Sequence, residues 1–351
     1  MNEVVLENNE TIRDIDVEGN LAMRTVKWGI IGAGQIAIKF ATALNSLDHT
    51  ELTAIASRDL NKAENFATRF HIRKAYGSYE EIIRDPEIDV IYIGTPHTEH
   101  KAHAKLCMEA GKAVLCEKPF TLNYSEAKEL VDLAKSCNVF LMEAMWTKFL
   151  PATRIVKQWI NNKLIGEIKY INISFGFRTE YDPGSRLYNP SLGGGALLDV
   201  GVYPISYVIH LMERLPDMIS SNAHLGQSKV DELNVITFQY NEGMLASISS
   251  AISAVTGNDA VIIGERGRIV IPNFWTAESA EVYDANGKLM DSFFHPFTSN
   301  GYVYEAEEVN RCIVEGKKQS DIIPLSDTLA IMKILDEIRA NWGLVYPSER
   351  K

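Results

Sequence analysis

The first half of the chain alternates short apolar runs with segments in which apolar residues recur at helical spacing. Short apolar runs with a β-branched bias predict buried strands. The predicted strands are Val26–Gly32, Leu52–Ala56, Val90–Ile93, Ala113–Cys116 and Val139–Met142. The predicted helices are Gln35–Ser46, Asn61–Phe70, His100–Ala110 and Ser125–Ser136. Strands that alternate with helices at this rhythm predict a parallel, doubly wound Rossmann sheet over residues 25–145.

The pattern changes after residue 145, where hairpin signals such as Asn241-Glu242-Gly243 separate strand-like runs. The predicted strands are Ile168–Phe177, Asn234–Tyr240, Met244–Ile252, Ala260–Ile263, Arg268–Ile271 and Ala280–Tyr283. The predicted helices are Leu150–Asn161, Ala196–Met212, Tyr304–Glu315 and Leu325–Asn341. Residues 146–351 are therefore predicted to form an α+β domain with a large open, mainly antiparallel sheet. Residues 1–24 are polar and acidic, and we interpret them as a tail.

The composition and net charge of the chain limit the classes of partner that it is expected to bind. Hydrophobic residues make up 46% of the chain, charged residues 23%, and the formal net charge is −11. This charge disfavours nucleic acid and anionic membranes as partners. The four cysteines are not closely spaced, which argues against a disulfide framework and against a zinc site. No apolar run approaches the roughly 20 residues of a membrane span. We therefore expect a cytoplasmic protein.

A glycine-rich turn, Gly32-Ala33-Gly34-Gln35-Ile36-Ala37, follows the first predicted strand and opens the first helix. Gly32 permits the tight turn, Gly34 lets backbone approach a pyrophosphate, and Ala37 allows the helix to pack closely on the strand. The start of the helix offers free N–H groups to phosphates. The alternative is a glycine turn without a ligand, but its place between strand and helix favours dinucleotide binding.

The end of the second strand carries Ser57 and Arg58, where an NAD site usually places a carboxylate. Asp59 comes later and could cap the next helix. A hydroxyl and a guanidinium suit the 2′-phosphate of NADP. The alternative is a solvated surface arginine. The sequence thus predicts a preference for NADP, with NAD possible.

Two further loops follow predicted strands at the edge where ligands bind. The first loop is Thr95-Pro96-His97, which precedes His100. A metal site at the two histidines would lack a third ligand, so we expect His97 to contact the cofactor. For His100, a role at the start of the following helix stays open. The second is Glu117-Lys118-Pro119, in which Lys118 is expected to point into the cleft and the proline permits a cis bond. An ordinary loop lysine is the alternative.

In the second half, Gly193-Gly194-Gly195 runs into a predicted helix that carries Asp199 and Tyr203. Residues four apart project from one helix face. Together with a lysine they can form an acid–base relay, in which the cation lowers the pKa of the tyrosine. A buried polar pair without catalytic function is an equally open alternative.

The chain resembles the Gfo/Idh/MocA oxidoreductase family. The resemblance covers nearly everything after the tail and is carried by Trp28-Gly29-Ile30-Ile31-Gly32-Ala33-Gly34, Glu117-Lys118-Pro119, and Gly194-Gly195 through Asp199 to Tyr203. The segment Glu143–Pro151 is similar to the branch of dimeric dihydrodiol dehydrogenases and NADP-dependent D-xylose dehydrogenases. Where many relatives have a histidine, that branch has a tyrosine, as here at position 203. Lys148 departs from the arginine common in the branch, so a cofactor contact there is in doubt.

The resemblance implies NAD(P) as cofactor and hydride transfer with a sugar, polyol or dihydrodiol. It implies that Lys118 contacts cofactor and substrate, that Tyr203 is the acid–base residue, and that Trp146 lies near both ligands. We expect Asp199 to orient Lys118 or a substrate hydroxyl, and Phe175 and Phe177 to line the pocket or to pack in the core. The open sheet implies a homodimer. Another sugar or inositol dehydrogenase that uses NAD, and an NADP-sensing regulator without turnover, remain alternatives.

Overall fold

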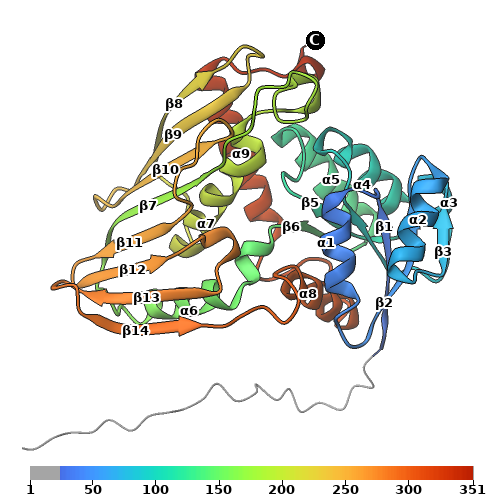
Figure 1. Cartoon of the computed structure of the whole chain (residues 1–351), viewed down its shortest axis with the longest axis horizontal. Coiled ribbons are helices and arrows are strands. Elements are labelled where there is room, and N and C mark those ends of the chain that lie inside the picture. The colour runs from blue at the N-terminus through green and yellow to red at the C-terminus, as the bar shows by residue number, and fades with distance from the viewer. Residues whose placement is uncertain (1–23, 351) are drawn as a thin grey trace, which may run out of the picture.

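The computed structural model describes residues 24–350. Of the tail predicted over residues 1–24, only Arg24 lies within this range. The described chain forms two sheets, with helices packed on both (Figure 1). The predicted strands and long helices are all present, with ends displaced by a few residues. The fold class predicted from the sequence is therefore confirmed.

The first sheet has six strands in the order β3-β2-β1-β4-β5-β6, and all its pairs are parallel. Its strands are β1 (Val26–Ile31), β2 (Thr50–Ala56), β3 (Lys74–Tyr76), β4 (Val90–Ile93), β5 (Ala113–Glu117) and β6 (Leu141–Ala144). Its helices are α1 (Gln35–Leu44), α2 (Leu60–Phe70), α3 (Tyr79–Ile82), α4 (His100–Glu109) and α5 (Tyr124–Cys137). The strand order reverses between β1 and β4, and ligands of such sheets bind outside this switch point.

The second sheet has eight strands in the order β14-β13-β12-β11-β7-β10-β9-β8. Its strands are β7 (Ile168–Gly176), β8 (Met218–Leu225), β9 (Asp231–Gln239), β10 (Leu245–Ala251), β11 (Ala260–Gly264), β12 (Gly267–Ile271), β13 (Ser279–Asp284) and β14 (Leu289–Phe294). It is mainly antiparallel, as predicted, except for the parallel central pair of β7 and β10. The connection from β7 to β10 contains α7 and then β8 and β9; α7 returns the chain so that β8 runs parallel to β7, and two antiparallel pairings bring β10 into the same direction.

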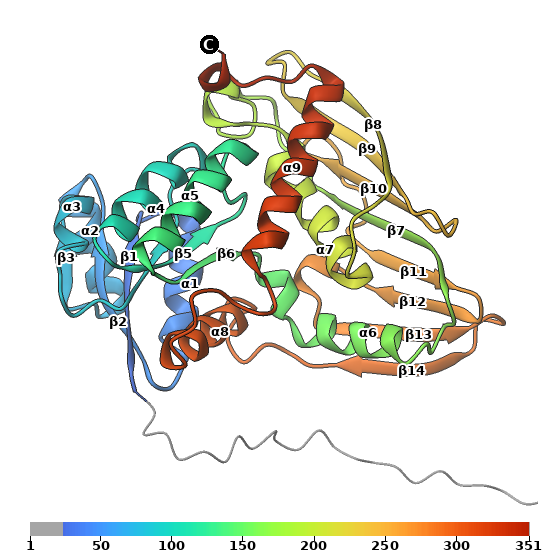
Figure 2. The same cartoon turned by 180° about the vertical axis from the view of Figure 1, so that it is seen from behind.

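One face of the second sheet is covered by α6 (Pro151–Asn161), α7 (Val202–Met212) and α9 (Leu325–Trp342). Figure 2 shows α9 between the two sheets, where it contacts both α5 and β8. Helix α8 (Val303–Val314) instead packs on α1 and β1, and its Asn310 accepts a hydrogen bond from the indole of Trp28 at 2.9 Å. The late helices thus fix the two sheets against each other. The boundary at residues 145 and 146 stays a prediction.

By length and composition alone, the segment Pro190–Met212 is apolar enough to cross a bilayer, although Gly193–Gly195 interrupt its helical turns. The prediction that no apolar run approaches that length was therefore wrong. In this structure 94% of the most apolar window is buried inside the fold. Burial of this kind is typical of a core helix, which has to be apolar on all sides.

Candidate functional site

The glycine-rich turn has the geometry that a phosphate-binding turn needs. Gly32 has a φ of +98°, and a Cβ there would lie 2.9 Å from the carbonyl oxygen of Gly94, so only glycine fits. At Gly34 a Cβ would have open space, with the same carbonyl 4.0 Å away. No side chain caps α1, and its first turn holds no acidic residue. The N–H groups at the start of α1, at Gln35 and Ile36, therefore suit a pyrophosphate.

At the end of β2, Asp59 does not occupy the position of a ribose-binding carboxylate. Its side chain accepts a hydrogen bond from the backbone N–H of Lys62 at 3.3 Å and so caps α2. The Ser57 hydroxyl accepts from the N–H of Asp59, also at 3.3 Å, and Arg58 is exposed beside it. The structure thus leaves a hydroxyl and an exposed guanidinium, which lies beside the phenol of Tyr79, at this tip.

The two histidines after β4 bind backbone carbonyls. A ring nitrogen of His97 lies 2.9 Å from the Gly193 oxygen, which ties the first domain to the glycine loop of the second. Both nitrogens of His100 lie 2.9 Å from carbonyl oxygens, those of Pro119 and Thr95. Burial lowers the pKa of each histidine to about 4. Their contacts support a role in fixing loops, and cofactor contact by His97, His100, Thr95 or Pro96 stays a prediction.

Glu117 and Lys118 lie at the end of β5, joined to a cis Pro119. The Glu117 carboxylate accepts from the Tyr92 hydroxyl at 2.6 Å and from the N–H of Lys118 at 3.1 Å. Burial raises the pKa of Glu117 above its usual range, although these donors and the Lys118 ammonium oppose the shift. The Lys118 ammonium reaches across the interdomain boundary and donates to the backbone oxygen of Asp199 at 2.7 Å.

Asp199 lies on a π-helical segment, η4 (Leu197–Gly201), that leads directly into α7. In π pairing the donor for the Asp199 oxygen is residue 204, which is Pro204 and has no N–H. This leaves the carbonyl open to the Lys118 ammonium. The Asp199 carboxylate lies 3.6 Å from the same ammonium and accepts from Arg186 at 2.7 Å. These cations lower the pKa of Asp199 despite the opposing effect of burial.

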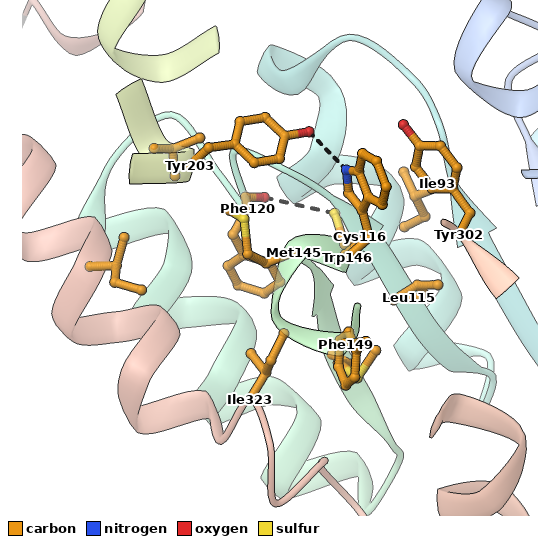
Figure 3. Packing of buried hydrophobic residues seen from close by; sticks show 14 of the residues in the cluster. Ile93, Leu115, Cys116, Phe120, Met145, Trp146, Phe149, Tyr203, Tyr302 and Ile323 are labelled. Carbon is orange, nitrogen blue, oxygen red and sulfur yellow. Dashed lines mark hydrogen bonds between the residues drawn. The ribbon is translucent and has the colours of Figure 1, made fainter. Parts of the chain in front are cut away.

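Tyr203, in the first turn of α7, lies beside this network. The Lys118 nitrogen is 4.9 Å from the centre of the Tyr203 ring, and Trp146 Nε1 donates to the phenolic oxygen at 3.1 Å (Figure 3). The predicted lowering of the tyrosine pKa is wrong for this structure: burial raises the pKa of Tyr203 well above its ordinary value, and Tyr302 and Glu117 add to the rise. The Lys118 charge does not offset the loss of water around the phenol.

Aromatic side chains surround the Tyr203 ring. Phe175 meets it edge-on with centroids 5.4 Å apart and stacks on Trp275 at 4.8 Å. Trp146 stacks on Tyr302 at 4.5 Å, as the labelled rings in Figure 3 show. Phe177 is half-buried, and none of the aromatic pairs in residues 24–350 joins it to this group. Its predicted contact with substrate stays a prediction.

The sequence did not single out three residues of this site, Arg186, Trp275 and Tyr302. It does predict that the loops over residues 178–192 and 295–302, which contain Arg186 and Tyr302, shape the pocket. Trp275 lies in a short 3-10 turn that no periodic pattern marks. The predicted group of Lys118, Asp199, Tyr203 and Trp146 is brought together, whereas Lys148 is buried away from solvent. Within residues 24–350, no three His, Cys, Asp or Glu side chains are placed to hold a metal ion.

Comparison with known proteins agrees with this architecture. Residues 26–145 match the family described as the oxidoreductase family with an NAD-binding Rossmann fold, and residues 153–270 match the GFO/IDH/MocA C-terminal domain. The trans-1,2-dihydrobenzene-1,2-diol dehydrogenase of Xenopus tropicalis is 40% identical over 334 residues, which cover 92% of this chain and 99% of the relative. The human enzyme of that name is 34% identical over 334 residues, which cover 93% of this chain and 99% of the relative.

Solved structures share the fold. The aldose-aldose oxidoreductase of Caulobacter crescentus, complexed with glycerol, has a TM-score of 0.82 at 22% identity, covering 92% of this chain and 100% of its own. The 3-ketoreductase KijD10 of Actinomadura kijaniata, in complex with NADP and TDP-benzene, has a TM-score of 0.80 at 24% identity. The match covers 90% of this chain and 98% of KijD10. The chain therefore belongs to the Gfo/Idh/MocA oxidoreductase family and is an NAD(P)-dependent oxidoreductase related to the dihydrodiol dehydrogenases.

Proposed function

We propose that this protein reduces and oxidises a carbonyl–carbinol pair of a cyclic diol or sugar, with NADP(H) as cofactor, Tyr203 as the acid–base residue and Lys118 as its electrostatic partner. The observation that carries the proposal is the convergence of Lys118, Asp199 and Tyr203, from opposite domains, on one point. The Lys118 ammonium lies 2.7 Å from the Asp199 oxygen and 4.9 Å from the Tyr203 ring centre. A regulator that only binds a nucleotide has no need of such a group.

The bound dinucleotide supplies the hydride donor or acceptor. Tyr203 holds its proton near neutral pH because burial raises its pKa, so it can donate directly to a carbonyl oxygen during reduction. Lys118 stabilises the negative charge that develops on that oxygen. In oxidation, the ionised form of Tyr203 accepts the hydroxyl proton, so this direction becomes faster as the pH rises. Asp199 holds Lys118 at this position through both its backbone oxygen and its carboxylate.

Two observations support NADP over NAD. Ser57 and Arg58 stand at the end of β2, and Asp59 is occupied as the cap of α2. A guanidinium binds a phosphate in two-point geometry and would leave the neutral ribose of NAD without its usual carboxylate partner. Solved structures of this fold include complexes with NADP and with NADH, so the fold alone does not choose between them.

The aromatic surroundings of Tyr203 favour a ring-shaped substrate. Trp146, Phe175, Trp275 and Tyr302 present flat apolar faces within one cluster. Such faces stack on the ring of a dihydrodiol and on the C–H face of a pyranose. The identity to dihydrodiol dehydrogenases over nearly the full chain supports the first of these.

We also propose a homodimer that forms through the open face of the second sheet. Met218, Val235, Leu245 and Ile263 are exposed on strands of this sheet. An apolar sheet face of this kind fits a protein partner better than water. The four cysteines are free thiols, which supports a cytoplasmic location.

A substrate panel followed by NADPH absorbance tests the enzymatic proposal. It contains trans-dihydrodiols, D-xylose, other aldoses and inositol, each with NADP and with NAD. We expect turnover of a cyclic diol or aldose with NADP, and loss of that turnover in Lys118→Met. Lys101→Met on α4 is the matched control and should keep the turnover, because the Lys101 ammonium pairs with Glu129 on α5 at 2.7 Å and takes no part in the Lys118–Asp199–Tyr203 group. Tight NADPH binding without turnover on the whole panel would contradict the proposal and favour a cofactor-sensing protein.

A further inference from the structure

A buried carboxyl group lies against the far side of the segment that carries Asp199. Asp231 begins β9 and is completely buried, as is its neighbour Asn234. Its Oδ2 accepts hydrogen bonds from the backbone N–H of Leu197 at 2.7 Å and from Asn234 Nδ2 at 2.8 Å. Leu197 is the first residue of η4, so the sheet holds the beginning of the π-helical segment through one side chain.

The glycine loop is shaped to admit this carboxyl group. At Gly195, whose φ is +123°, a Cβ would lie 2.2 Å from Asp231 Oδ1. Any other residue at this position would push Asp231 away from Leu197. The preceding Gly194 is held by the hydroxyl of Tyr346, which donates to its carbonyl oxygen at 2.8 Å. The glycine loop is therefore held by Asp231 and Tyr346, in addition to the contact of His97 with the Gly193 oxygen.

The chain of contacts continues to the site. Asp231 fixes the N–H of Leu197, and two residues later the backbone oxygen of Asp199 accepts from the Lys118 ammonium at 2.7 Å. Lys118 comes from the other domain, so the position of its ammonium depends on where η4 presents that oxygen. We propose that Asp231 is a positioning residue for Lys118 and acts through the backbone of η4. This inference rests on the proposed function, because it assumes that Lys118 assists the reaction.

The charge of Asp231 gives the contact its strength. A hydrogen bond from an N–H to a carboxylate is stronger than one to a neutral acid. Around Asp231 the charged and titratable groups are Arg339 on α9 and the phenol of Tyr346, and neither donates to it. Burial raises the pKa of Asp231 to about 7. As the pH falls through that value the carboxylate gains a proton, and its hold on Leu197 weakens.

Asp231→Asn is the direct test, with kcat, the KM for NADPH and the pH profile as readouts. The amide keeps the shape but removes the charge. We expect kcat to fall about 10-fold, the KM for NADPH to change less than twofold, and the limb of the kcat profile with a midpoint near pH 7 to disappear. Ser250→Ala is the matched control: it removes a buried hydrogen bond to Asn234 Oδ1 at 2.9 Å but leaves the Asp231–Leu197 contact. It should retain the wild-type profile.

Lys118→Met, measured in parallel, separates two kinds of failure. If Lys118→Met loses turnover while Asp231→Asn keeps both wild-type kcat and the wild-type pH profile, the positioning role is overturned and the proposed function stands. If Lys118→Met is itself fully active, the proposed function fails. Should Asp231→Asn not fold, Asn234→Ala decides, since it removes the second donor to Oδ2. An intermediate loss of kcat supports the role, and a wild-type kcat with an unchanged pH profile overturns it.

Discussion

Trp146 Nε1 donates a hydrogen bond to the Tyr203 hydroxyl at 3.1 Å, although the two residues lie 57 positions apart in the chain. A donor to the phenolic oxygen favours the phenolate and lowers the pKa of Tyr203, against the larger effect of burial. Trp146 is itself held between Tyr302 and Trp275. The indole therefore both shapes the pocket and adjusts the acidity of the tyrosine.

Trp146→Phe should keep the ring packing and lose this hydrogen bond. We expect the pKa of Tyr203 to rise further, so that the rate of the oxidation reaction reaches its plateau at a higher pH. The rate near neutral pH should fall about 10-fold, as expected for a weakened acid–base group. The measurement is kcat/KM against pH in the oxidation direction. An unshifted profile would show that the indole N–H does not act on the tyrosine.

Arg58→Ala tests the choice of cofactor. The loss of the guanidinium should lower kcat/KM for NADP about 10-fold or more while leaving that for NAD nearly unchanged, because only NADP carries the 2′-phosphate. Lys62→Ala, which removes an exposed cation from the adjoining first turn of α2, is the matched control. It should leave the ratio of kcat/KM for NADP to kcat/KM for NAD unchanged. A wild-type ratio in Arg58→Ala would mean that this arginine is an ordinary surface residue.

Arg186→Ala should loosen Asp199, whose carboxylate it binds at 2.7 Å and, through its second nitrogen, at 3.4 Å. The expected result is a fall of about 10-fold in kcat/KM for the substrate, with unchanged NADPH affinity, because the paired contact orients the carboxylate. Arg186→Lys keeps the charge without the planar fork and should recover part of the loss. Equal rates in Arg186→Ala and in Arg178→Ala, an exposed arginine of the same loop, would contradict this role.

Glu305→Gln tests a buried acid beside Tyr302. Glu305 is fully buried, and neither carboxyl oxygen has a hydrogen-bond partner in the described part of the chain. Burial raises its pKa well above the ordinary value, so the folded protein keeps a proton that the unfolded chain loses above about pH 4.3. The folded state binds more protons, and the free energy of unfolding therefore falls as the pH rises, until the folded group also ionises.

Glutamine cannot ionise, so Glu305→Gln should lose less stability than the wild type between pH 5 and pH 8. One proton corresponds to about 1.4 kcal/mol per pH unit over the affected interval. Urea unfolding at the two pH values measures the difference. If the free energy of unfolding falls by the same amount between pH 5 and pH 8 in the wild type and in Glu305→Gln, Glu305 is ionised in the folded state.

The sequence predicted the long elements because their burial pattern is periodic. Strands such as β4 are buried along their whole length, and the apolar run makes them visible. β3 has only three residues and α3 four, too few for a period to be recognised. β8 alternates half-buried and exposed positions with small polar residues, and β14 is mostly exposed. These edge strands were missed because little of their surface faces the core.

The site was predictable where a short motif carries the chemistry, as in Glu117-Lys118-Pro119 and in the pair Asp199 and Tyr203. For η4, Pro204 predicts an irregular start of the helix, but the contacts that Lys118 and Asp231 make with this segment come from distant parts of the chain and carry no local sequence signal. The pKa of Tyr203 was predicted in the wrong direction for the same reason. A sequence motif indicates that a cation such as Lys118 lies near Tyr203, but the burial of the phenol, which raises its pKa, is determined only by the packing of the folded chain.

Single-turnover hydride transfer in Tyr203→Phe is the most direct test of the central claim. The substitution removes one oxygen and keeps the ring in contact with Phe175 and Trp275. With NADPH and the carbonyl substrate bound, we predict a rate of hydride transfer at least about 100-fold below that of the wild type. The NADPH affinity and the unfolding midpoint should be unchanged. A rate within a few fold of the wild type, in a correctly folded variant, would contradict the assignment of Tyr203 as the proton donor.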